Sequence, residues 1–356
     1  MHFYKIVVTG GAGFVGSNLA LKLKSAYPHA QVAALDSLKR RGSELALPRL
    51  RDAGVPFVHA DIRCPEDLEA LPAFDLLIDC SAEPSVHAGG EGSPAYVLNT
   101  NLQGTLNLLE AARTRKAAFL FLSTSRVYPM GALNQLAWHE ADTRFEWDGT
   151  QPARGASAAG ISEEFPLEGA RSFYGASKLA GELILQEYVY NYGMPALINR
   201  CGVLAGPWQM GKVDQGVVTL WVARHHFQRP LRYIGYGGTG KQVRDLLHIE
   251  DLFALLQRQF VRTDTWDGRV YNVGGGRPVS VSLQELTALC QAATGHTVEI
   301  GAEPETHAVD LRIYLSDAAR VQHDYAWTPE HDPEKIVADI AAWLQSYETQ
   351  LAPLFT

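Results

Sequence analysis

The sequence predicts an α/β fold built on a doubly wound, parallel sheet with helices on both faces. Short apolar stretches alternate with helical patterns from the N-terminus, and a glycine-rich turn joins the first strand to the first helix. Polar loops follow successive strands. Ligands bind such sheets beyond the carboxyl ends of the strands, so these loops are expected to form one functional site.

Composition narrows the class of protein. The 356 residues can bury a large core, and 46% of them are hydrophobic. A net charge of -8 argues against a nucleic-acid partner, because phosphate backbones require a basic surface. The four cysteines lack zinc-ligand spacing, so we expect reduced thiols and no metal site. With no apolar run of roughly 18 residues and no signal-peptide pattern, we expect a cytoplasmic protein without a membrane partner.

The first strand, residues 4–9, leads into Gly10, Gly13 and Gly16, which precede a helical pattern. The first glycine permits a tight turn, and the second lets backbone N–H groups approach a pyrophosphate at the helix N-terminus. The third lets the helix pack close to the strand. Because these glycines stand between a strand and a helix, they are more specific than a lone glycine run. They predict a dinucleotide site, whose expected contacts in this turn also include Phe14 and Val15.

Asp36 ends the second strand, residues 31–35, about twenty residues beyond the glycines. A carboxylate there accepts hydrogen bonds from the adenosine ribose and repels a 2'-phosphate, which favours NAD over NADP. Lys39, Arg40 and Arg41 follow closely and weaken this preference. They are either solvated loop charges or include one side chain that lines the adenosine site, for which Arg40 is our candidate.

Further strands are expected at residues 55–59, 75–80 and 117–122, and each opens into a polar loop. Asp61 follows the third strand, either beside the adenine ring or in a surface turn. The helix at 94–113 has apolar positions on more than one face, as expected if it packs against the sheet and a second subunit. The remaining predicted cofactor contacts are Ser37, Ile62, Ser81, Ala82, Glu83, Asn101 and Ser123.

Tyr174 and Lys178 lie one helical turn apart in a helix expected at 172–192, so they share a face. An ammonium beside a phenol favours the phenolate, which can take a proton from a sugar hydroxyl. The spacing alone is weak, because such pairs occur by chance on many solvated helices. An irregular, polar segment at 131–169 precedes this helix and is expected to cover the active-site mouth.

The later part of the chain predicts a second, smaller lobe that is interleaved with the first. The periodicity changes after the strand that ends near Arg200. We expect residues 1–200, with 243–276 returning to them, to form the NAD-binding domain. Residues 201–242 and 277–356 are expected to form the substrate lobe.

Taken together, these motifs resemble the extended short-chain dehydrogenase/reductases, a family of nucleotide-sugar epimerases, dehydratases and decarboxylases. The matching residues are 9–16, Asp36, 61–63, 123–125 and 174–178. The resemblance implies a Rossmann-type domain, NAD as cofactor and a nucleotide-sugar substrate. It implies that Thr124, Tyr174 and Lys178 are catalytic, that the last two also contact NAD, and that the substrate is held by Ser125, Arg126, Gln215, Arg244 and Asp310.

Within that family, five segments are similar to the CDP-paratose 2-epimerases, also called CDP-tyvelose epimerases. These segments are 36–43, 160–167, 214–216, 240–245 and 271–275, of which the second and third discriminate best.

Four positions depart from the family pattern. Gly202 stands where many relatives have an asparagine that contacts the diphosphate, and Pro129 replaces a usual glycine. Ala205 and Trp208 replace a tyrosine and an arginine. Trp208 is expected either to stack on a nucleobase or to pack in the core. These changes leave the nucleobase and the sugar open.

The residues after Thr124 discriminate among the reactions of the family. Dehydratases carry an acidic pair there, and decarboxylases carry a glutamate in the second position, whereas this chain has Ser125 and Arg126. Of the reactions of the family, the removal and return of a hydride remains, which predicts an epimerase. The resemblance to the CDP-paratose 2-epimerases implies that it acts at carbon 2 of a CDP-linked deoxyhexose. The alternatives are a UDP-sugar 4-epimerase, a net dehydrogenase or reductase, and a non-catalytic NAD-binding regulatory protein. The family also implies a homodimer or homotetramer that pairs the helices at 94–113 and 173–192.

Overall fold

The computed structural model describes residues 2–90, 92–211 and 215–355, and the chain divides into two compact units. The first unit comprises Met1–Val127, Ser172–Arg200 and Phe253–Tyr271. The second comprises Tyr128–Arg171, Cys201–Leu252 and Asn272–Thr356. This division differs from the expected one, since residues 128–171 group with the second unit, where their strands make their hydrogen bonds. Of the segment 243–276, which was expected to return to the first domain, only residues 253–271 do so.

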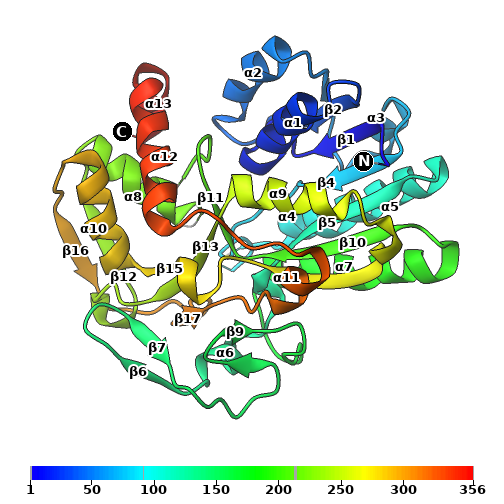
Figure 1. Ribbon diagram of the computed structural model, residues 1–356. Helices are drawn as coiled ribbons and strands as arrows, with labels where there is room; N and C mark the ends of the chain where they lie inside the picture. The colour runs from blue at the N-terminus through cyan, green and yellow to red at the C-terminus, as the bar shows by residue number, and fades with distance from the viewer. Residues whose placement is uncertain (1, 91, 212–214, 356) are drawn as a thin grey trace. The chain divides into compact units, whose positions relative to one another are not determined.

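A seven-stranded sheet forms the centre of the first unit, in the order β14-β10-β5-β4-β1-β2-β3 (Figure 1). The neighbours β4–β5, β1–β4, β1–β2 and β2–β3 pair in parallel. The chain starts in the middle of the sheet and builds outward in both directions, which is the doubly wound topology that the sequence predicts. The strands are β1 (Lys5–Thr9), β2 (Gln31–Asp36), β3 (Phe57–His59), β4 (Leu76–Asp79), β5 (Ala118–Thr124), β10 (Ala196–Cys201) and β14 (Asp267–Val273).

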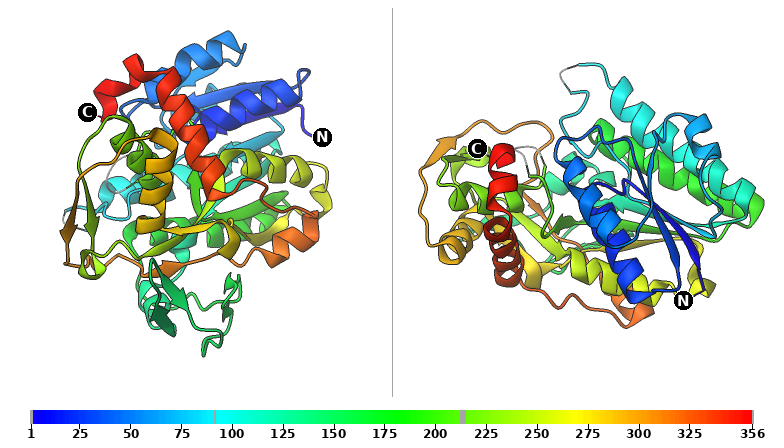
Figure 2. Two further views of the ribbon diagram at one scale, coloured as in Figure 1. Left: turned by 60° about the vertical axis from the view of Figure 1, so that its left-hand side comes forward. Right: turned by 90° about the horizontal axis from the view of Figure 1, so that it is seen from above.

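Both faces of this sheet are covered, so its strands are continuous apolar runs instead of alternating ones. On one face, Val7, Leu77 and Phe119 belong to a core cluster that includes residues of α5 (Gly104–Arg115) and α7 (Phe173–Tyr192). The residues next to these in each strand are equally buried and point to the opposite face. Helix α1 (Phe14–Ala26) lies on that side of the sheet, away from the cyan and green helices α5 and α7 (Figure 2).

The helix expected at 94–113 is interrupted. It consists of α4 (Ala95–Leu98), a π-helical turn (Asn99–Gln103) and α5, in one continuous run. The π turn places Asn101 in the interior, where its side chain reaches the loop after β4. Single π turns within helices are frequent at functional sites, and this one contains a predicted cofactor residue.

A smaller sheet organises the second unit. Its central strand β13 (Val243–His248) pairs with β11 (Val203–Ala205) and β17 (Ile313–Tyr314) in parallel, and with β15 (Ser280–Ser282) in antiparallel fashion. Three helices pack against one another beside it. They are α8 (Val217–His226), α10 (Leu283–Thr294) and α12 (Pro333–Ser346).

The segment at 131–169 has more regular structure than the sequence predicts. It contains α6 (Met130–Asn134) and two short hairpins, of which β6–β7 pairs Trp138–Glu140 with Phe145–Trp147. Phe145 N–H donates to the Lys241 carbonyl (2.9 Å), and Lys241 Nζ donates to Glu140 (2.8 Å). These strands could not be predicted from the sequence, because the segment is polar and each strand is only two or three residues long and depends on tertiary partners.

No helix among the described residues is long and apolar enough to cross a membrane. The remaining elements are α1 (Phe14–Ala26), α2 (Ala46–Asp52), α3 (Pro65–Glu69), β8 (Ala156–Ser157), β9 (Gly160–Ile161), β12 (Leu231–Ile234), α9 (Ile249–Gln259), β16 (Ile300–Glu303), α11 (Ala319–Tyr325) and α13 (Glu348–Phe355).

Candidate active site

The predicted cofactor residues of the first unit gather where the sequence places them. The glycine turn follows β1, Asp36 ends β2, and Asp61 follows β3. Ser81 follows β4, and Ser123 is the next-to-last residue of β5. Because these five strands are adjacent and their paired members run in parallel, the loops share the carboxyl edge of one sheet.

The glycine turn between β1 and α1 is sterically closed to larger residues. Gly10 has φ +59°, and a Cβ there would lie 2.7 Å from the Cys80 carbonyl oxygen. A Cβ on Gly16 would lie 2.1 Å from the Gly10 carbonyl oxygen, so the third glycine lets helix α1 pack directly on the turn. Gly13 is the N-cap of α1 and supplies no side-chain cap. The amides of the first helical turn therefore keep the capacity to bind a pyrophosphate.

Asp36 is fixed against this turn. Its carboxylate accepts hydrogen bonds from Ala12 N–H (3.1 Å) and Leu38 N–H (2.8 Å). Burial raises the pKa of Asp36, and these backbone N–H donors oppose the rise. A partly buried acceptor at the end of β2 fits a ribose with free hydroxyls, in agreement with NAD as the cofactor.

Asp61 and Ile62 follow β3, and the first side chain forms an ion pair whereas the second is buried in the core. Arg63 grips the Asp61 carboxylate through Nε (2.9 Å) and Nη2 (2.5 Å), and this hydrogen-bonded pairing lowers the pKa of Asp61. Ile62 is buried, with its side chain against Gly104 of α5. A cofactor contact from Ile62 would therefore come from its backbone.

A buried polar network, which sequence reasoning did not identify, joins the loop after β4 to strand β1 and to the helical run that contains α5. Asp79, at the end of β4, accepts from Thr9 Oγ1 (2.8 Å), Ser81 N–H (3.0 Å) and Thr105 Oγ1 (3.3 Å). Thr105 Oγ1 also lies 2.8 Å from the Asn101 carbonyl oxygen. All but Ser81 are almost fully buried, so the network fixes the loop after β4 against β1 and α5.

Asn101 extends this network to the predicted catalytic helix. Its Oδ1 accepts from Glu83 N–H (2.8 Å), and its Nδ2 donates to the Glu83 carbonyl (3.0 Å) and to Ser177 Oγ (3.2 Å). Ser177 Oγ in turn donates to the Tyr174 carbonyl (2.8 Å). Asn101 thus holds the loop of Ser81, Ala82 and Glu83 beside α7. In the sequence, the one signal for this structural role was an asparagine at an internal position of a helix with several apolar faces.

The predicted catalytic residues lie on neighbouring elements of the first unit. Tyr174 and Lys178 occupy the first turns of α7, which packs against β5 and against the turn Ser125–Val127. Lys178 is 2% exposed, and its Nζ lies 3.9 Å from the centre of the Phe121 ring in β5. Thr124 ends β5, and its Oγ1 accepts from Arg126 N–H (3.2 Å). Helix α7 therefore brings the Tyr–Lys pair to the carboxyl end of the strand that carries Thr124.

A buried ion pair, which the sequence analysis also did not predict, lies next to the strand end that carries Thr124. Glu182 of α7 and Arg200 of β10 form a buried ion pair, with Nη2 2.6 Å from Oε2 and side-chain exposures of 2% and 5%. Ser123 Oγ donates to Glu182 Oε1 (2.5 Å). The pair therefore fixes the end of β5, one residue before Thr124, against α7. Ser123, predicted to contact the cofactor, has this structural partner.

Arg244 and Asp310 lie in the second unit. The Arg244 guanidinium donates to the carbonyls of Val243 and Leu311, both at 2.7 Å. The Asp310 carbonyl accepts from Asn134 Nδ2 (3.0 Å), and its carboxylate faces the Gly235 turn. Gln215 directly precedes Gly216, the N-cap of α8. Asp214, part of the segment at 214–216, lies outside the described residues.

Trp208 packs against aromatic side chains of the second unit. Its ring centre lies 4.7 Å from that of Tyr347 and 5.7 Å from that of Trp343, and its φ is +72°. Trp208 is therefore half-buried against aromatic side chains, and its stacking on a nucleobase stays a prediction. Ala205 is fully buried.

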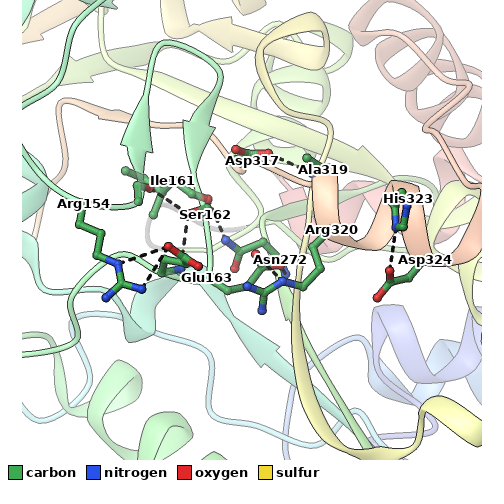
Figure 3. A network of polar contacts seen from close by, with 12 residues as sticks. Arg154, Ile161, Ser162, Glu163, Asn272, Asp317, Ala319, Arg320, His323 and Asp324 are labelled. Carbon is green, nitrogen blue, oxygen red and sulfur yellow. Dashed lines mark hydrogen bonds and ion pairs between the residues drawn. The ribbon is translucent and has the colours of Figure 1, made fainter.

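The segment at 160–167 is held within the second unit by a polar network (Figure 3). Glu163 Oε1 accepts from Asn272 N–H (2.7 Å), and Asn272 Nδ2 donates to the Ile161 carbonyl (2.7 Å). Arg320 lies 3.6 Å from the second Glu163 oxygen, and burial raises the pKa of this glutamate. Asn272, which groups with the second unit, is the next-to-last residue of β14, so the network joins the insert to this residue.

Asp245, next to Arg244, is fully buried between glycines. Its Oδ2 accepts from Gly276 N–H and Ser316 N–H (both 3.2 Å), while Oδ1 has no hydrogen-bond partner within the described residues. A Cβ on Gly202 would lie 3.2 Å from both oxygens, so an asparagine there would crowd this carboxylate. Burial raises the pKa of Asp245 to about 6, against opposing hydrogen bonds from Ser316 and Gly276.

This burial predicts a pH dependence of stability. Between the unfolded pKa near 3.8 and the folded pKa of about 6, only the folded state holds the Asp245 proton. Stability is therefore greatest below the unfolded pKa and falls as the pH rises through the folded pKa, by about 3 kcal/mol in all. In the wild type, the free energy of unfolding by urea is expected to be lower at pH 8 than at pH 5 by about half of this amount. Asp245→Asn has no carboxyl group at this position, so its free energy of unfolding should lack this difference. Equal pH dependence in both proteins would contradict the assignment.

The geometry of the first unit defines a class of protein. A glycine turn opens onto a helix N-terminus without a side-chain cap, and a fixed carboxylate ends β2. A Tyr–Lys pair lies beside the carboxyl end of β5. This combination is that of an NAD-binding enzyme with a doubly wound sheet.

The chain belongs to the NAD dependent epimerase/dehydratase family, whose model matches residues 6–274. It is 28% identical to CDP-paratose 2-epimerase of Salmonella typhi, across 96% of this chain and 99% of that protein. It is 30% identical to dTDP-glucose 4,6-dehydratase of Streptomyces griseus, across 98% of this chain and 96% of the relative. The UDP-glucose 4-epimerase of Thermus thermophilus, solved with NAD, matches with a TM-score of 0.75 and 25% identity, across 96% of this chain and 99% of that one.

Epimerases and dehydratases match about equally well, so the comparisons define an NAD-dependent enzyme of the nucleotide-sugar epimerase/dehydratase family. They agree with the predicted fold and cofactor. The reaction and the sugar have to be argued from the residues of this chain.

Proposed function

We propose that the protein is an NAD-dependent nucleotide-sugar epimerase that inverts carbon 2 of a CDP-linked deoxyhexose. The observation that carries the reaction type is the pair Ser125 and Arg126 directly after Thr124, beside an intact Tyr174 and Lys178. Elimination of water requires an acid to protonate the leaving hydroxyl, and neither residue supplies a carboxyl group. Similarity to CDP-paratose 2-epimerase across 96% of the chain supports the choice of substrate.

In the proposed mechanism, Thr124 and Tyr174 hydrogen-bond one hydroxyl of the sugar. NAD, which the glycine turn and Asp36 would hold, would supply the hydride chemistry: removal from the carbon that carries this hydroxyl and return to the opposite face. Tyr174, as the phenolate, takes the hydroxyl proton during oxidation and gives it back during reduction. The ammonium of Lys178 favours the phenolate form and holds the nicotinamide ribose. The reaction has no net oxidation, so NAD is expected to stay bound between turnovers.

The nucleotide half of the substrate requires donors to its diphosphate. We assign this role to Arg244, because a guanidinium offers several N–H groups to phosphate oxygens. Ser125, Arg126, Gln215 and Asp310 are proposed to orient the remainder of the substrate.

A UDP-sugar 4-epimerase is the second candidate, because the same three catalytic residues serve it and the UDP-glucose 4-epimerase structure matches this chain. A panel of CDP-, UDP- and dTDP-linked hexoses, with the inverted carbon located by NMR, separates the candidates. Inversion at carbon 2 of a CDP-sugar is expected. Inversion at carbon 4 of a UDP-sugar would replace the proposal with the second candidate, and loss of the 6-hydroxyl would show a dehydratase. Steady release of NADH would indicate a net dehydrogenase, and no turnover with any sugar would favour a regulatory protein.

We further propose that the enzyme is at least a dimer. Helix α7 exposes large apolar side chains, including Phe173 (41% exposed), Leu183 (56%) and Tyr190 (86%). It packs beside α5, so the two helices present a joint surface of the kind that pairs subunits.

A single charge is expected to disrupt this interface. Leu183→Arg places a cation in the apolar surface of α7 and should convert the dimer to monomer, measured by light scattering after size-exclusion chromatography. Asp52→Arg introduces the same residue at an exposed position of α2 and should leave the mass unchanged. A wild-type protein that runs as a monomer at micromolar concentration would refute the interface.

A further inference from the structure

Two cationic side chains meet at one aromatic ring in the first unit, and the three residues follow three different strands of the sheet. Lys39 follows β2, Arg63 follows β3, and Tyr96 is the second residue of the helical run after β4. Lys39 Nζ lies 3.6 Å from the centre of the Tyr96 ring, and the Arg63 guanidinium carbon lies 5.3 Å from it. Neither Tyr96 nor Lys39 is part of the cofactor set that the glycine turn and Asp36 define.

The ring sits among residues that are themselves fixed. Arg63 is bound to the Asp61 carboxylate through two nitrogens at 2.5–3.1 Å, so it cannot follow Tyr96 if the ring moves away. Tyr96 lies in α4, which continues directly into the π turn that carries Asn101. Asn101 holds the backbone of Glu83. The position of Tyr96 is therefore coupled to the loop after β4.

We propose that Tyr96, Lys39 and Arg63 form a clasp that holds the adenosine half of NAD in its site. Cations over an aromatic face are attracted by its quadrupole, so the ring ties together the loops that carry Asp36, Asp61 and Glu83. Because the clasp orders these loops before NAD binds, it lowers the entropic cost of NAD binding. Release of NAD requires the loops to separate, so the clasp also slows release. The clasp also holds Lys39 against the ring, away from a role as a phosphate ligand, which fits a cofactor without a 2'-phosphate.

The inference depends on the dinucleotide site and is independent of which sugar is epimerised. Its test is therefore the rate at which NAD leaves the purified protein, followed by enzymatic assay of the released NAD after dilution. Tyr96→Leu removes the aromatic face and is expected to release NAD about tenfold faster, because two exposed cation–π contacts are lost. Tyr96→Phe keeps the ring and should release NAD at the wild-type rate.

A matched control lies elsewhere in the same unit. The Arg113 guanidinium carbon stands 5.0 Å from the centre of the Tyr192 ring, on α5 and α7 and away from the strand ends. Tyr192→Leu removes a cation–π contact of the same kind and should not change NAD release. Wild-type release from Tyr96→Leu would overturn the clasp, as would equal acceleration in Tyr96→Phe or Tyr192→Leu. A wild-type protein that binds no NAD would overturn the clasp and the dinucleotide site together, whereas an unexpected sugar specificity affects neither.

Discussion

Tyr174→Phe is expected to lower kcat by about 10²- to 10⁴-fold, the usual contribution of a positioned general base. The substitution removes one oxygen atom from α7 and leaves the ring in place. The phenol hydroxyl is the proposed acceptor of the sugar proton, and the remaining donor, Thr124, cannot act as a base. NAD content should stay at the wild-type level, since the glycine turn and Asp36 are untouched.

The matched control is Tyr190→Phe, on the same helix but with the ring 86% exposed. It should keep wild-type turnover. Turnover should be measured with the substrate that the sugar panel identifies, together with the NAD released on denaturation. Near-normal turnover by Tyr174→Phe would refute Tyr174 as the base, whereas loss of both turnover and NAD would show a structural defect instead.

Glu182→Ala is expected to destabilise the protein by about 3–5 kcal/mol, because it leaves the Arg200 guanidinium buried and unpaired. Both side chains are at most 5% exposed, so water cannot replace the lost carboxylate. Ser123 loses its acceptor at the same time, which loosens the strand end that carries Thr124. Urea unfolding of the NAD-free protein measures the change in the free energy of unfolding.

Two further variants show whether burial is the cause. The double variant Glu182→Leu/Arg200→Met replaces both charges with apolar groups and should recover most of the lost stability. Glu110→Ala breaks the Arg113 pair on α5, whose side chains are 36% and 46% exposed, and should cost under about 1 kcal/mol. A loss of similar size in Glu110→Ala and Glu182→Ala would contradict the role of burial.

The local part of the site could be predicted from the sequence because its signals are short-range. The spacing of Gly10, Gly13 and Gly16 between a strand and a helix defines the turn, and the structure supplies a steric reason for two of these glycines. Tyr174 and Lys178 share a helical face through their spacing alone. The alternation of strands and helices determines the doubly wound sheet, and with it the edge where these residues gather.

Other parts could not be predicted, because they join residues far apart in the chain. The segment at 131–169 was expected to be irregular, yet its hairpin pairs Trp138 with Trp147 and bonds to Lys241. The helix at 94–113 is interrupted by the π turn in which Asn101 bonds to Glu83, eighteen residues earlier. The packing of Trp208 depends on Trp343 and Tyr347, near the other end of the chain.

The sequence by itself determined the fold class and predicted the glycine turn and the Tyr–Lys pair, since each depends on a periodicity or a spacing of a few residues. The tertiary structure decided what holds these groups in place. Asp79 with Asn101, Glu182 with Arg200, and Tyr96 with Lys39 and Arg63 are contacts between different elements. A buried charge or a polar side chain is stable only where a distant partner meets it, and that meeting is a property of the folded chain.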